Sequence, residues 1–229
     1  MSFRFTEGEI LLINKPYTWS SFDVVNNFRM FLKSKLGIKK IKIGHAGTLD
    51  PLATGLLILC TGKFTKKIEE FKEFDKEYTG VFTLGATTPT FDLESEVDQR
   101  FDTRSVTDQQ ILGAARSFTG NQMQVPPKFS AVKIRGRRAY DYARQDEEVR
   151  IAPKEIQISA FEITRIEMPA VHFRISCSKG TYIRALARDF GAALNNGAYL
   201  SALCRTRIGP YHLRDAWELD ALKSSLSRD

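Results

Sequence analysis

An aspartate within a glycine-rich segment is the residue of this chain best suited to chemistry. The segment Gly44–Gly55 reads Gly-His-Ala-Gly-Thr-Leu-Asp-Pro-Leu-Ala-Thr-Gly, with Asp50 directly before Pro51. Glycine adopts backbone conformations that other residues avoid, and a following proline biases Asp50 towards an extended conformation. We therefore predict a structured loop that holds a carboxylate in place, where it can act as a nucleophile or a general base. The alternative is an aspartate that caps a turn, and composition alone does not separate the two.

Four other segments accompany the Asp50 segment along the chain. They are Leu12-Ile13-Asn14-Lys15-Pro16, Lys76-Glu77-Tyr78, Val125-Pro126-Pro127-Lys128-Phe129-Ser130-Ala131 and Ser178-Lys179-Gly180-Thr181-Tyr182-Ile183-Arg184. Together with Gly44–Gly55 they resemble, in the same order, the active-site segments of the tRNA pseudouridine-55 synthases (the TruB family). The likeness covers nearly the whole chain and does not rest on one motif.

The resemblance implies an isomerase that converts a uridine in the T-loop of tRNA to pseudouridine. That reaction breaks the bond from C1′ to N1 and forms one from C1′ to C5, and it needs no redox cofactor and no metal. Asp50 is implied as the catalytic carboxylate. It could add to the base, add to C1′ or remove a proton from C2′, and the sequence leaves these three routes open.

Two further catalytic residues are implied by the same likeness. Arg184 matches the arginine that pairs with the catalytic aspartate, a role suited to a guanidinium because it is always charged and can grip a carboxylate with two hydrogen bonds. Tyr78 matches a tyrosine that stacks on the target base, a contact worth roughly 1–3 kcal/mol. From the residues alone, Arg184 could instead contact phosphate or form a surface ion pair, and Tyr78 could be a core residue of a strand.

Several residues are expected to contact RNA. The target base must be extruded before a carboxylate can reach it, and His45 is the family's candidate to fill the vacated stack. Asp92 is expected to contact the flipped nucleotides, and Lys15 either supports the backbone of the site or contacts RNA. Two positions depart from the family, Phe129 in place of tyrosine and Pro89 in place of aspartate. The remaining predicted RNA contacts are Lys66, Lys133, Arg135, Arg137 and Tyr182.

Charge also favours a polyanionic partner. The 229 residues include 34 Lys and Arg against 27 Asp and Glu, which gives a net charge of +7. Two clusters of basic residues, within 29–42 and 128–138, contain no acidic residue. A solvated face would explain either cluster alone, but two of them beside Gly- or Pro-rich loops fit a phosphate backbone better.

Other functional classes fit the sequence less well. Gly62-Lys63 is not a P-loop, because Phe64 replaces the Ser or Thr and Leu57 stands where the first glycine should be. No Gly-x-Ser-x-Gly motif of a serine hydrolase occurs. The serious alternative is a non-catalytic RNA-binding or RNA-chaperone protein that uses Asp50 only structurally.

Composition indicates a cytoplasmic protein with a substantial core. No apolar run approaches the length of a membrane span, and no signal peptide begins the chain. The three scattered cysteines are typical of buried thiols and do not suggest a disulfide framework or a metal site. We expect a monomer that acts on the T-arm of tRNA without an obligatory protein partner.

The hydrophobic periodicity predicts a single α+β domain over residues 1–229, with a large, mainly antiparallel mixed sheet flanked by helices. Residues 121–150 are interpreted as an excursion that matches the family's RNA-gripping insertion, and the family's C-terminal PUA domain is expected to be absent. A capping box at Ser20 and Asp23 begins a helix that keeps Val25, Phe28, Leu32 and Leu36 near one face. The predicted strands are 9–14, 56–60, 78–84, 155–168, 170–178 and 199–209, and the predicted helices are 20–37, 65–74, 107–117, 139–144, 180–195 and 215–224.

Overall fold

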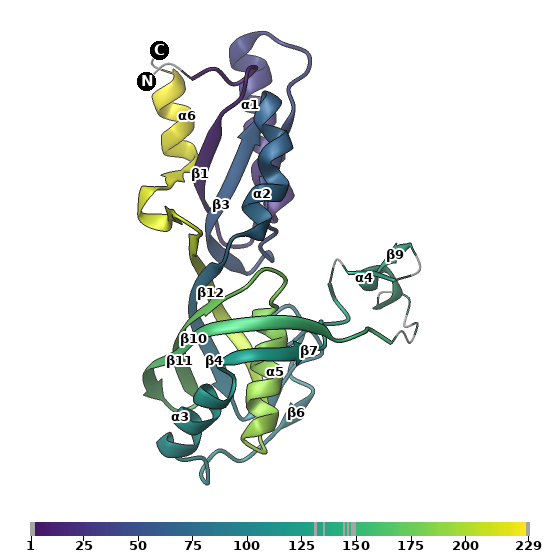
Figure 1. Cartoon of the computed structure of the whole chain (residues 1–229), viewed down its shortest axis with the longest axis vertical. Helices are drawn as coiled ribbons and strands as arrows, with labels where there is room; N and C mark the ends of the chain where they lie inside the picture. The colour runs from purple at the N-terminus through teal and green to yellow at the C-terminus, as the bar shows by residue number, and fades with distance from the viewer. Residues whose placement is uncertain are drawn as a thin grey trace. The chain divides into compact units, whose positions relative to one another are not determined.

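The computed structural model describes residues 3–130, 132–134, 136–143, 145, 147 and 150–227. Contacts within the chain define two compact units. The first unit comprises Met1–Tyr78 and Leu203–Asp229, and the second comprises Thr79–Ala202. The chain passes between them twice, in strands β4 (Lys76–Leu84) and β12 (Ala198–Ile208), which are labelled in Figure 1.

The first unit is built on strand β3 (Ala53–Thr61). This strand runs antiparallel to β1 (Ile10–Lys15) and β2 (Ile43–Ala46), and parallel to the second half of β12. Its remaining strands and helices are β13 (Tyr211–His212), β14 (Trp217–Glu218), α1 (Ser21–Leu36), α2 (Ile68–Glu73), α6 (Leu219–Ser227) and the 3₁₀ segments Gly62–Lys67 and Leu213–Asp215.

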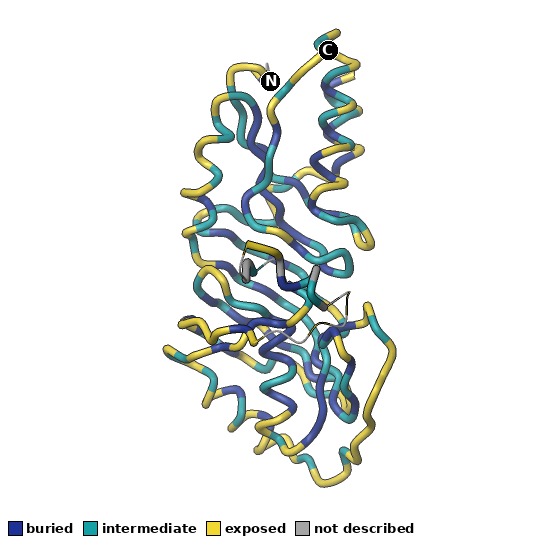
Figure 2. The backbone as a smooth tube through the Cα atoms, turned by 90° about the vertical axis from the view of Figure 1, so that its right-hand side faces the viewer, coloured by how far each residue is buried: buried dark blue, intermediate teal, exposed yellow. Residues whose placement is uncertain are grey.

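The apolar run in β3 reflects burial on both faces of the strand. Leu57 and Leu59 belong to a core cluster with α1 and α6, whereas Ile58 and Cys60 belong to a second cluster with Phe71 of α2. Successive side chains of a strand point to opposite faces, so a strand covered on both sides is apolar at consecutive positions, as in 56–60. Figure 2 shows this strand-rich interior as dark blue, with yellow concentrated in loops and on the outer faces of helices.

The second unit has an antiparallel hairpin at its centre. Strands β10 (Lys154–Glu167) and β11 (Ala170–Cys177) pair along their length and turn at Pro169, as predicted. A cluster of aromatic rings, including Phe82, Phe173 and Phe190 of α5, fills its core. The other elements are α3 (Asp108–Ser117), α4 (Ala139–Ala143), α5 (Ile183–Ala193), β5 (Ala86–Thr87), β6 (Gln99–Arg100), β7 (Gly120–Gln124), β8 (Lys133–Ile134) and β9 (Arg137–Arg138).

The predicted caps are confirmed. Ser20 and Asp23 form the capping box of α1, and Gly37 ends that helix with a left-handed φ of 63°. Thr107 and Gln110 form the corresponding box of α3. These signals are local, because each cap satisfies backbone groups within one turn of the helix, and local signals can be read from sequence.

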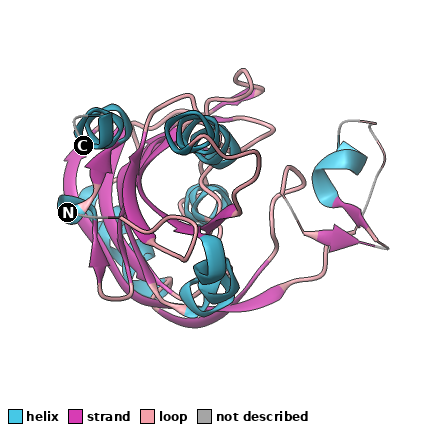
Figure 3. Cartoon of the chain, turned by 90° about the horizontal axis from the view of Figure 1, so that it is seen from above, coloured by secondary structure: helices cyan, strands magenta, loops and turns pink. Residues whose placement is uncertain are grey.

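Some element boundaries differ from the prediction. Strand β7 pairs with β10, so residues 120–124 belong to the sheet and the excursion begins after them. Figure 1 shows β9 and α4 standing apart from the sheet of their unit, and Figure 3 shows the same region from above. The predicted helix 215–224 begins only at Leu219, because Trp217 and Glu218 pair with β1. The predicted helix 65–74 is shorter in the structure, because residues 62–67 form a 3₁₀ segment ahead of α2. At the end of α1, Leu36 is 40% exposed, unlike Val25 and Phe28, which are buried.

Burial of the cysteines agrees with the prediction at two of the three positions. Cys60 and Cys177 are buried, whereas Cys204 is half-buried. Burial raises the pKa of the Cys60 thiol to about 11, so this group stays protonated at neutral pH. None of the helices in the described ranges is both long and apolar enough to cross a membrane.

Candidate active site

The loop that carries Asp50 is shorter than the sequence suggests. Gly44–Ala46 lie in β2 and Ala53–Gly55 lie in β3, which leaves residues 47–52, called here the Asp50 loop. The Ala53 amide donates to the Asp50 carbonyl over 3.1 Å, so a backbone hydrogen bond closes the turn after Asp50. The loop is therefore a tight connection between paired strands, which limits how far the carboxylate can move.

The middle of the Asp50 loop is fixed by the start of α1. The Leu49 amide donates to Ser21 Oγ over 2.8 Å, and that hydroxyl donates to the Leu49 carbonyl over 3.1 Å. Ser21 is 1% exposed, so water does not compete for these bonds. The residue directly before Asp50 thus has both backbone polar groups satisfied by one side chain.

Lys15 holds Pro51, the residue directly after Asp50. Its ammonium donates to the carbonyls of Pro51 at 3.2 Å and Pro16 at 2.8 Å, and also to that of Trp19. Burial lowers the pKa of Lys15 to about 8, against an opposing effect of the Asp50 carboxylate. Lys15 is fully buried, so of its two predicted roles this geometry favours support of the backbone.

Arg205 holds the first residue of the loop. Its Nη2 donates to the Gly47 carbonyl over 2.9 Å and its Nε donates to the Leu56 carbonyl over 2.8 Å. Arg205 lies on β12, opposite Gly55 of β3, and is 1% exposed. The sequence analysis missed this residue. The available signal was an arginine within the predicted strand 199–209.

Tyr78 lies on β4, and β4 is two strands away in the sheet from β3, which begins directly after the Asp50 loop. Strand β12 lies between β3 and β4, with Arg205 opposite Gly55 and the Thr206 hydroxyl donating to the Glu77 carboxylate over 2.8 Å. Two strand spacings amount to roughly 10 Å between backbones, a distance that side chains can bridge. Tyr78 is 9% exposed, so its ring is largely enclosed.

His45 precedes the loop, opposite Leu59 on β3. Burial, followed by the charge of Arg205, lowers the pKa of His45, so the imidazole is neutral at neutral pH. Its Nδ1 atom is buried without a hydrogen-bond partner in the part of the chain that the structure describes. A neutral, partly enclosed ring is suited to stacking in place of an extruded base.

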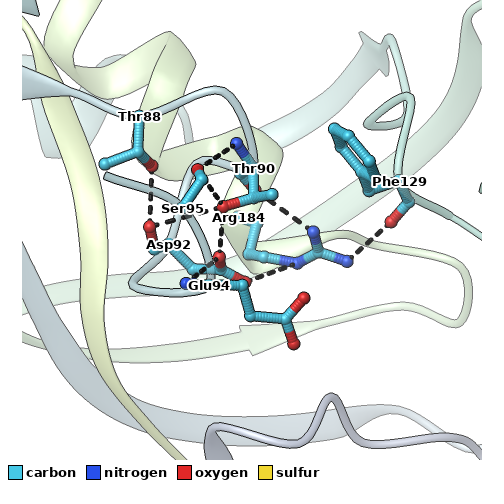
Figure 4. Close-up of polar contacts among 7 residues, drawn as sticks. All are labelled: Thr88, Thr90, Asp92, Glu94, Ser95, Phe129 and Arg184. Atoms are coloured by element: carbon cyan, nitrogen blue, oxygen red, sulfur yellow. Dashed lines mark hydrogen bonds and ion pairs between the residues drawn. The ribbon is translucent and has the colours of Figure 1, made fainter. Parts of the chain in front are cut away.

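Arg184 occupies a buried polar cluster in the second unit, drawn in Figure 4. From the first turn of α5, its Nη1 donates to the Thr90 carbonyl over 3.1 Å and its Nη2 to the Phe129 carbonyl over 2.9 Å. Its Nε lies 3.5 Å from Oδ2 of Asp92. The guanidinium thus joins α5 to two loops, including the segment where Phe129 replaces the family's tyrosine.

Asp92 is buried beside this guanidinium. Its Oδ1 accepts from Thr90 Oγ1 at 2.6 Å and from the Glu94 amide at 3.0 Å, as Figure 4 shows. Its carbonyl accepts from the Thr88 hydroxyl at 2.7 Å. Asp92 is 4% exposed. These hydrogen bonds give its carboxylate a structural role within the unit besides any role towards RNA. Pro89 does not prevent this arrangement.

Tyr182 is held by its backbone at the start of α5. Its amide donates to Oε1 of Gln124 over 2.8 Å, and Nε2 of Gln124 donates to its carbonyl over 3.1 Å. Gln124 is 3% exposed and is a second residue that sequence reasoning missed. This amide side chain ties β7 to the segment that carries Arg184.

The predicted basic contacts lie in both units. Lys66 lines a pocket of about 280 Å³ in the first unit together with Lys40, Lys42 and Lys63, with no acidic residue among its lining residues. In the second unit, the exposed Arg137 lies over the Tyr142 ring at 4.3 Å and donates to Gln145. Lys133 is in β8, and Arg135 lies outside the described residues.

The predicted pair of Asp50 and Arg184 stays a prediction, because the two residues belong to different units. A metal role for the candidate residues has no support from clustering of ligands. The described ranges contain no group of three or more His, Cys, Asp or Glu side chains that could hold a metal ion.

The chain is similar to known proteins along nearly its whole length. A family model described as TruB family pseudouridylate synthase (N terminal domain) matches residues 33–183. The tRNA pseudouridine synthase B of Flavobacterium johnsoniae is 52% identical, over 97% of this chain and 98% of the relative. That of Phocaeicola vulgatus is 50% identical, over 98% and 96% of the two chains.

Solved structures give the fold. The chain matches a crystal structure of a Cbf5-Nop10-Gar1 complex with a TM-score of 0.72 and 28% identity, over 96% of this chain and 54% of that chain. An H/ACA RNP bound to a substrate RNA containing 2′-deoxyuridine matches with a TM-score of 0.67 and 26% identity, over 96% and 53%. The chain spans about half the length of these two solved chains. Its mixed α+β fold is that of the pseudouridine synthases, as predicted.

The sequence relatives identify the family within the pseudouridine synthases. With about half of all positions identical to curated relatives along almost their whole length, the chain belongs to the TruB family of pseudouridylate synthases.

Proposed function

We propose that this chain isomerises a uridine in the T-loop of tRNA, U55, to pseudouridine. Family membership and relatives named tRNA pseudouridine synthase B support the reaction and the substrate class. The observation that carries the proposal is the fixing of the Asp50 loop by Ser21, Lys15 and Arg205, all almost fully buried. A loop held at Gly47, Leu49 and Pro51 suits a carboxylate that must meet one reacting atom.

The reaction conserves all atoms and electrons. The bond from C1′ to N1 breaks, the detached uracil turns, a bond from C1′ to C5 forms, and the proton on C5 is lost while N1 gains one. The Asp50 carboxylate serves as nucleophile or base at the junction of sugar and base, by any of the three routes left open above. No oxidant, reductant or metal ion takes part in this balance.

Arg184 and Tyr78 are proposed to complete the catalytic set. Arg184 would pair with the ionised carboxylate of Asp50, and its attachment to Thr90 and Phe129 supports a guanidinium of fixed orientation. Tyr78 would stack on the detached base and place its hydroxyl near C5. The enclosure of Tyr78 supports stacking, because an aromatic ring contributes most where water is excluded.

The proposed RNA contacts extend from this set to both basic regions. His45 would fill the place of the extruded base, Asp92 and Tyr182 would face the flipped nucleotides, and Lys66 with its neighbours would bind backbone phosphates. The segment with Lys133, Arg135 and Arg137 would grip the T-arm. We further propose that the chain acts as a monomer on cytoplasmic tRNA.

The test is Asp50→Asn, which keeps the shape of the side chain and removes its charge. We expect no pseudouridine at single-nucleotide resolution in an unmodified tRNA transcript, whereas the wild type modifies the T-loop alone. The Kd for tRNA should change little. Asp215→Asn is the matched control, since Asp215 is an exposed carboxylate of the same unit.

Three other outcomes of this experiment would each contradict part of the proposal. Full activity in Asp50→Asn would eliminate Asp50 as the catalytic group. Binding of tRNA by the wild type without any pseudouridine would leave the RNA-binding alternative, in which Asp50 is only structural. Product at positions outside the T-loop would overturn the proposed substrate.

A further inference from the structure

A buried guanidinium links the two ends of the Asp50 loop. Arg205 donates to the carbonyl of Gly47, where the loop begins, and to that of Leu56 in β3, four residues past the last loop residue, Leu52. Ser21 and Lys15 act on the middle of the loop, so Arg205 alone among these three residues connects its entry to its exit. The carbonyl of Asp50 meanwhile accepts from Ala53, between these two points.

Two glycines of the loop segment are explained by Arg205. A Cβ atom at Gly55 would lie 2.4 Å from the Arg205 carbonyl oxygen, and one at Gly47 would lie 3.3 Å from Arg205 Nη1. Both glycines also have positive φ, 104° and 86°. Larger residues would displace the arginine or its strand, so the glycines and Arg205 form one arrangement.

A buried arginine is a costly way to fill a core. Removing a cation from water is unfavourable unless its donors are satisfied, and a hydrophobic side chain of similar size often stabilises a protein as well or better. Arg205 is 1% exposed and lies on the same strand as the fully apolar Ile208. What the guanidinium provides, and an apolar residue would not, is directed hydrogen bonds to Gly47 and Leu56.

We propose that Arg205 is a positioning residue that sets the place of the Asp50 carboxylate by bridging the ends of its loop. This inference rests on the proposed function. Arg205 does not itself meet the substrate; it acts through the backbone of the loop. Misplacing a reacting group by about 1 Å lowers a rate by roughly 100-fold, which sets the expected effect of losing the bridge.

The experiment replaces the guanidinium and measures chemistry, binding and loop order separately. For Arg205→Met we expect the single-turnover rate on a T-arm stem–loop to fall roughly 100-fold. The Kd for that RNA should change less than about threefold, since Arg205 offers no surface to RNA. Hydrogen exchange of the amides in residues 47–53 should be at least about tenfold faster than in the wild type.

Two further variants separate positioning from general stability. Arg205→Lys keeps the charge and at least one donor, so its rate should lie between those of the wild type and Arg205→Met, and this milder change preserves the fold. Arg207→Met is the matched control, because Arg207 lies two residues further along β12 and donates to the Gly209 carbonyl instead. It should keep the wild-type rate.

The outcomes distinguish this inference from the proposed function. If folded Arg205→Met or Arg205→Lys turns over RNA at the wild-type rate, or if exchange in residues 47–53 is unchanged, the positioning role is wrong. If the wild type itself forms no pseudouridine, the proposed function fails, and the exchange measurement still decides whether Arg205 orders the loop. The inference would also be overturned by a variant that turns over RNA slowly while its loop amides exchange as slowly as those of the wild type.

Discussion

At the scale of single residues, the Asp50 loop is held by cations that bind carbonyl groups. Lys15 and Arg205 are both almost fully buried, and both direct donors at the backbone of the loop. Their charges also act on one another, since Arg205 contributes to the lowered pKa of Lys15 after the larger effect of burial. The carboxylate of Asp50 opposes that effect, so the three charges form one electrostatic group.

The lowered pKa of Lys15 predicts a dependence of stability on pH. In the folded protein the pKa of Lys15 is about 8, whereas in an unfolded chain a lysine has a pKa of about 10.4. Below pH 8 both states hold the proton and the burial cost of the charge is present in full. Between these values the unfolded state binds more protons, so the Lys15 contribution to the free energy of unfolding rises with pH.

Urea unfolding of the wild type and of Lys15→Met at several pH values tests this sign. The difference in unfolding free energy between the two proteins should shift in favour of the wild type from pH 8 to pH 10, since methionine does not titrate. A flat difference, or one that moves the other way, would mean that the Lys15 pKa is not lowered.

At the scale of elements, helix α5 organises the second unit's part of the proposed site. Arg184 and Arg188 lie four residues apart and therefore on one face of the helix. Arg184 binds the carbonyls of Thr90 and Phe129, and Arg188 binds the Val125 carbonyl with its guanidinium 5.1 Å from the Phe91 ring centroid. One helical face thus fixes both loops that depart from the family pattern.

The pocket beside the 3₁₀ segment Gly62–Lys67 gives a prediction on RNA binding. Replacing Lys63 and Lys66 with glutamine should weaken tRNA binding and reduce the slope of log K against log salt. Each lost phosphate contact should lower that slope by roughly 0.9 in a duplex and 0.7 in a single strand. Filter binding over a range of salt concentrations measures the slope.

A matched control for this variant is Lys72 and Lys223 replaced with glutamine. Both lysines belong to the same unit, and each already forms an ion pair, with Glu69 and Asp220 respectively. The control has the same net charge and should retain the wild-type slope. Equal slopes in all three proteins would place the phosphate contacts elsewhere.

At the scale of the whole molecule, the chain comprises two compact units that share strands β4 and β12. Asp50, Tyr78, Lys15 and Arg205 belong to the first, and Arg184 and Asp92 to the second. The catalytic set proposed here therefore draws on segments that are distant in sequence. The second group comes from residues 79–202, with Arg184 on α5 and Asp92 in the segment between β5 and β6.

Activity of the whole chain should not depend on a metal ion. The proposed isomerisation is redox-neutral, and its nucleophile or base is a carboxylate of the chain itself. We expect the purified protein to convert a synthetic T-arm stem–loop at the same rate before and after dialysis against EDTA in monovalent salt. If activity is lost after EDTA and one added divalent cation restores it, the proposed mechanism omits a required metal ion.

Much of the fold could be predicted because its signals are local. The caps at Ser20 and Thr107, the buried run of β3 and the hairpin at Pro169 each depend on residues close in sequence. The two missed strands lie where distant pairing decided. Residues 217–218 became a strand through pairing with β1, and residues 120–124 joined the sheet through β10.

The amino-acid sequence by itself determined the candidate chemistry, because its motifs resemble those of the TruB family and that resemblance singled out Asp50, Tyr78 and Arg184. Only the tertiary structure decided what holds Asp50 in place. Ser21, Lys15 and Arg205 reach its loop from three different elements, and the last lies 158 residues from the carbonyl it binds. Hydrogen bonds to carbonyl groups leave no side-chain pattern in sequence, because every residue has a carbonyl, so such partners emerge only when the chain is folded.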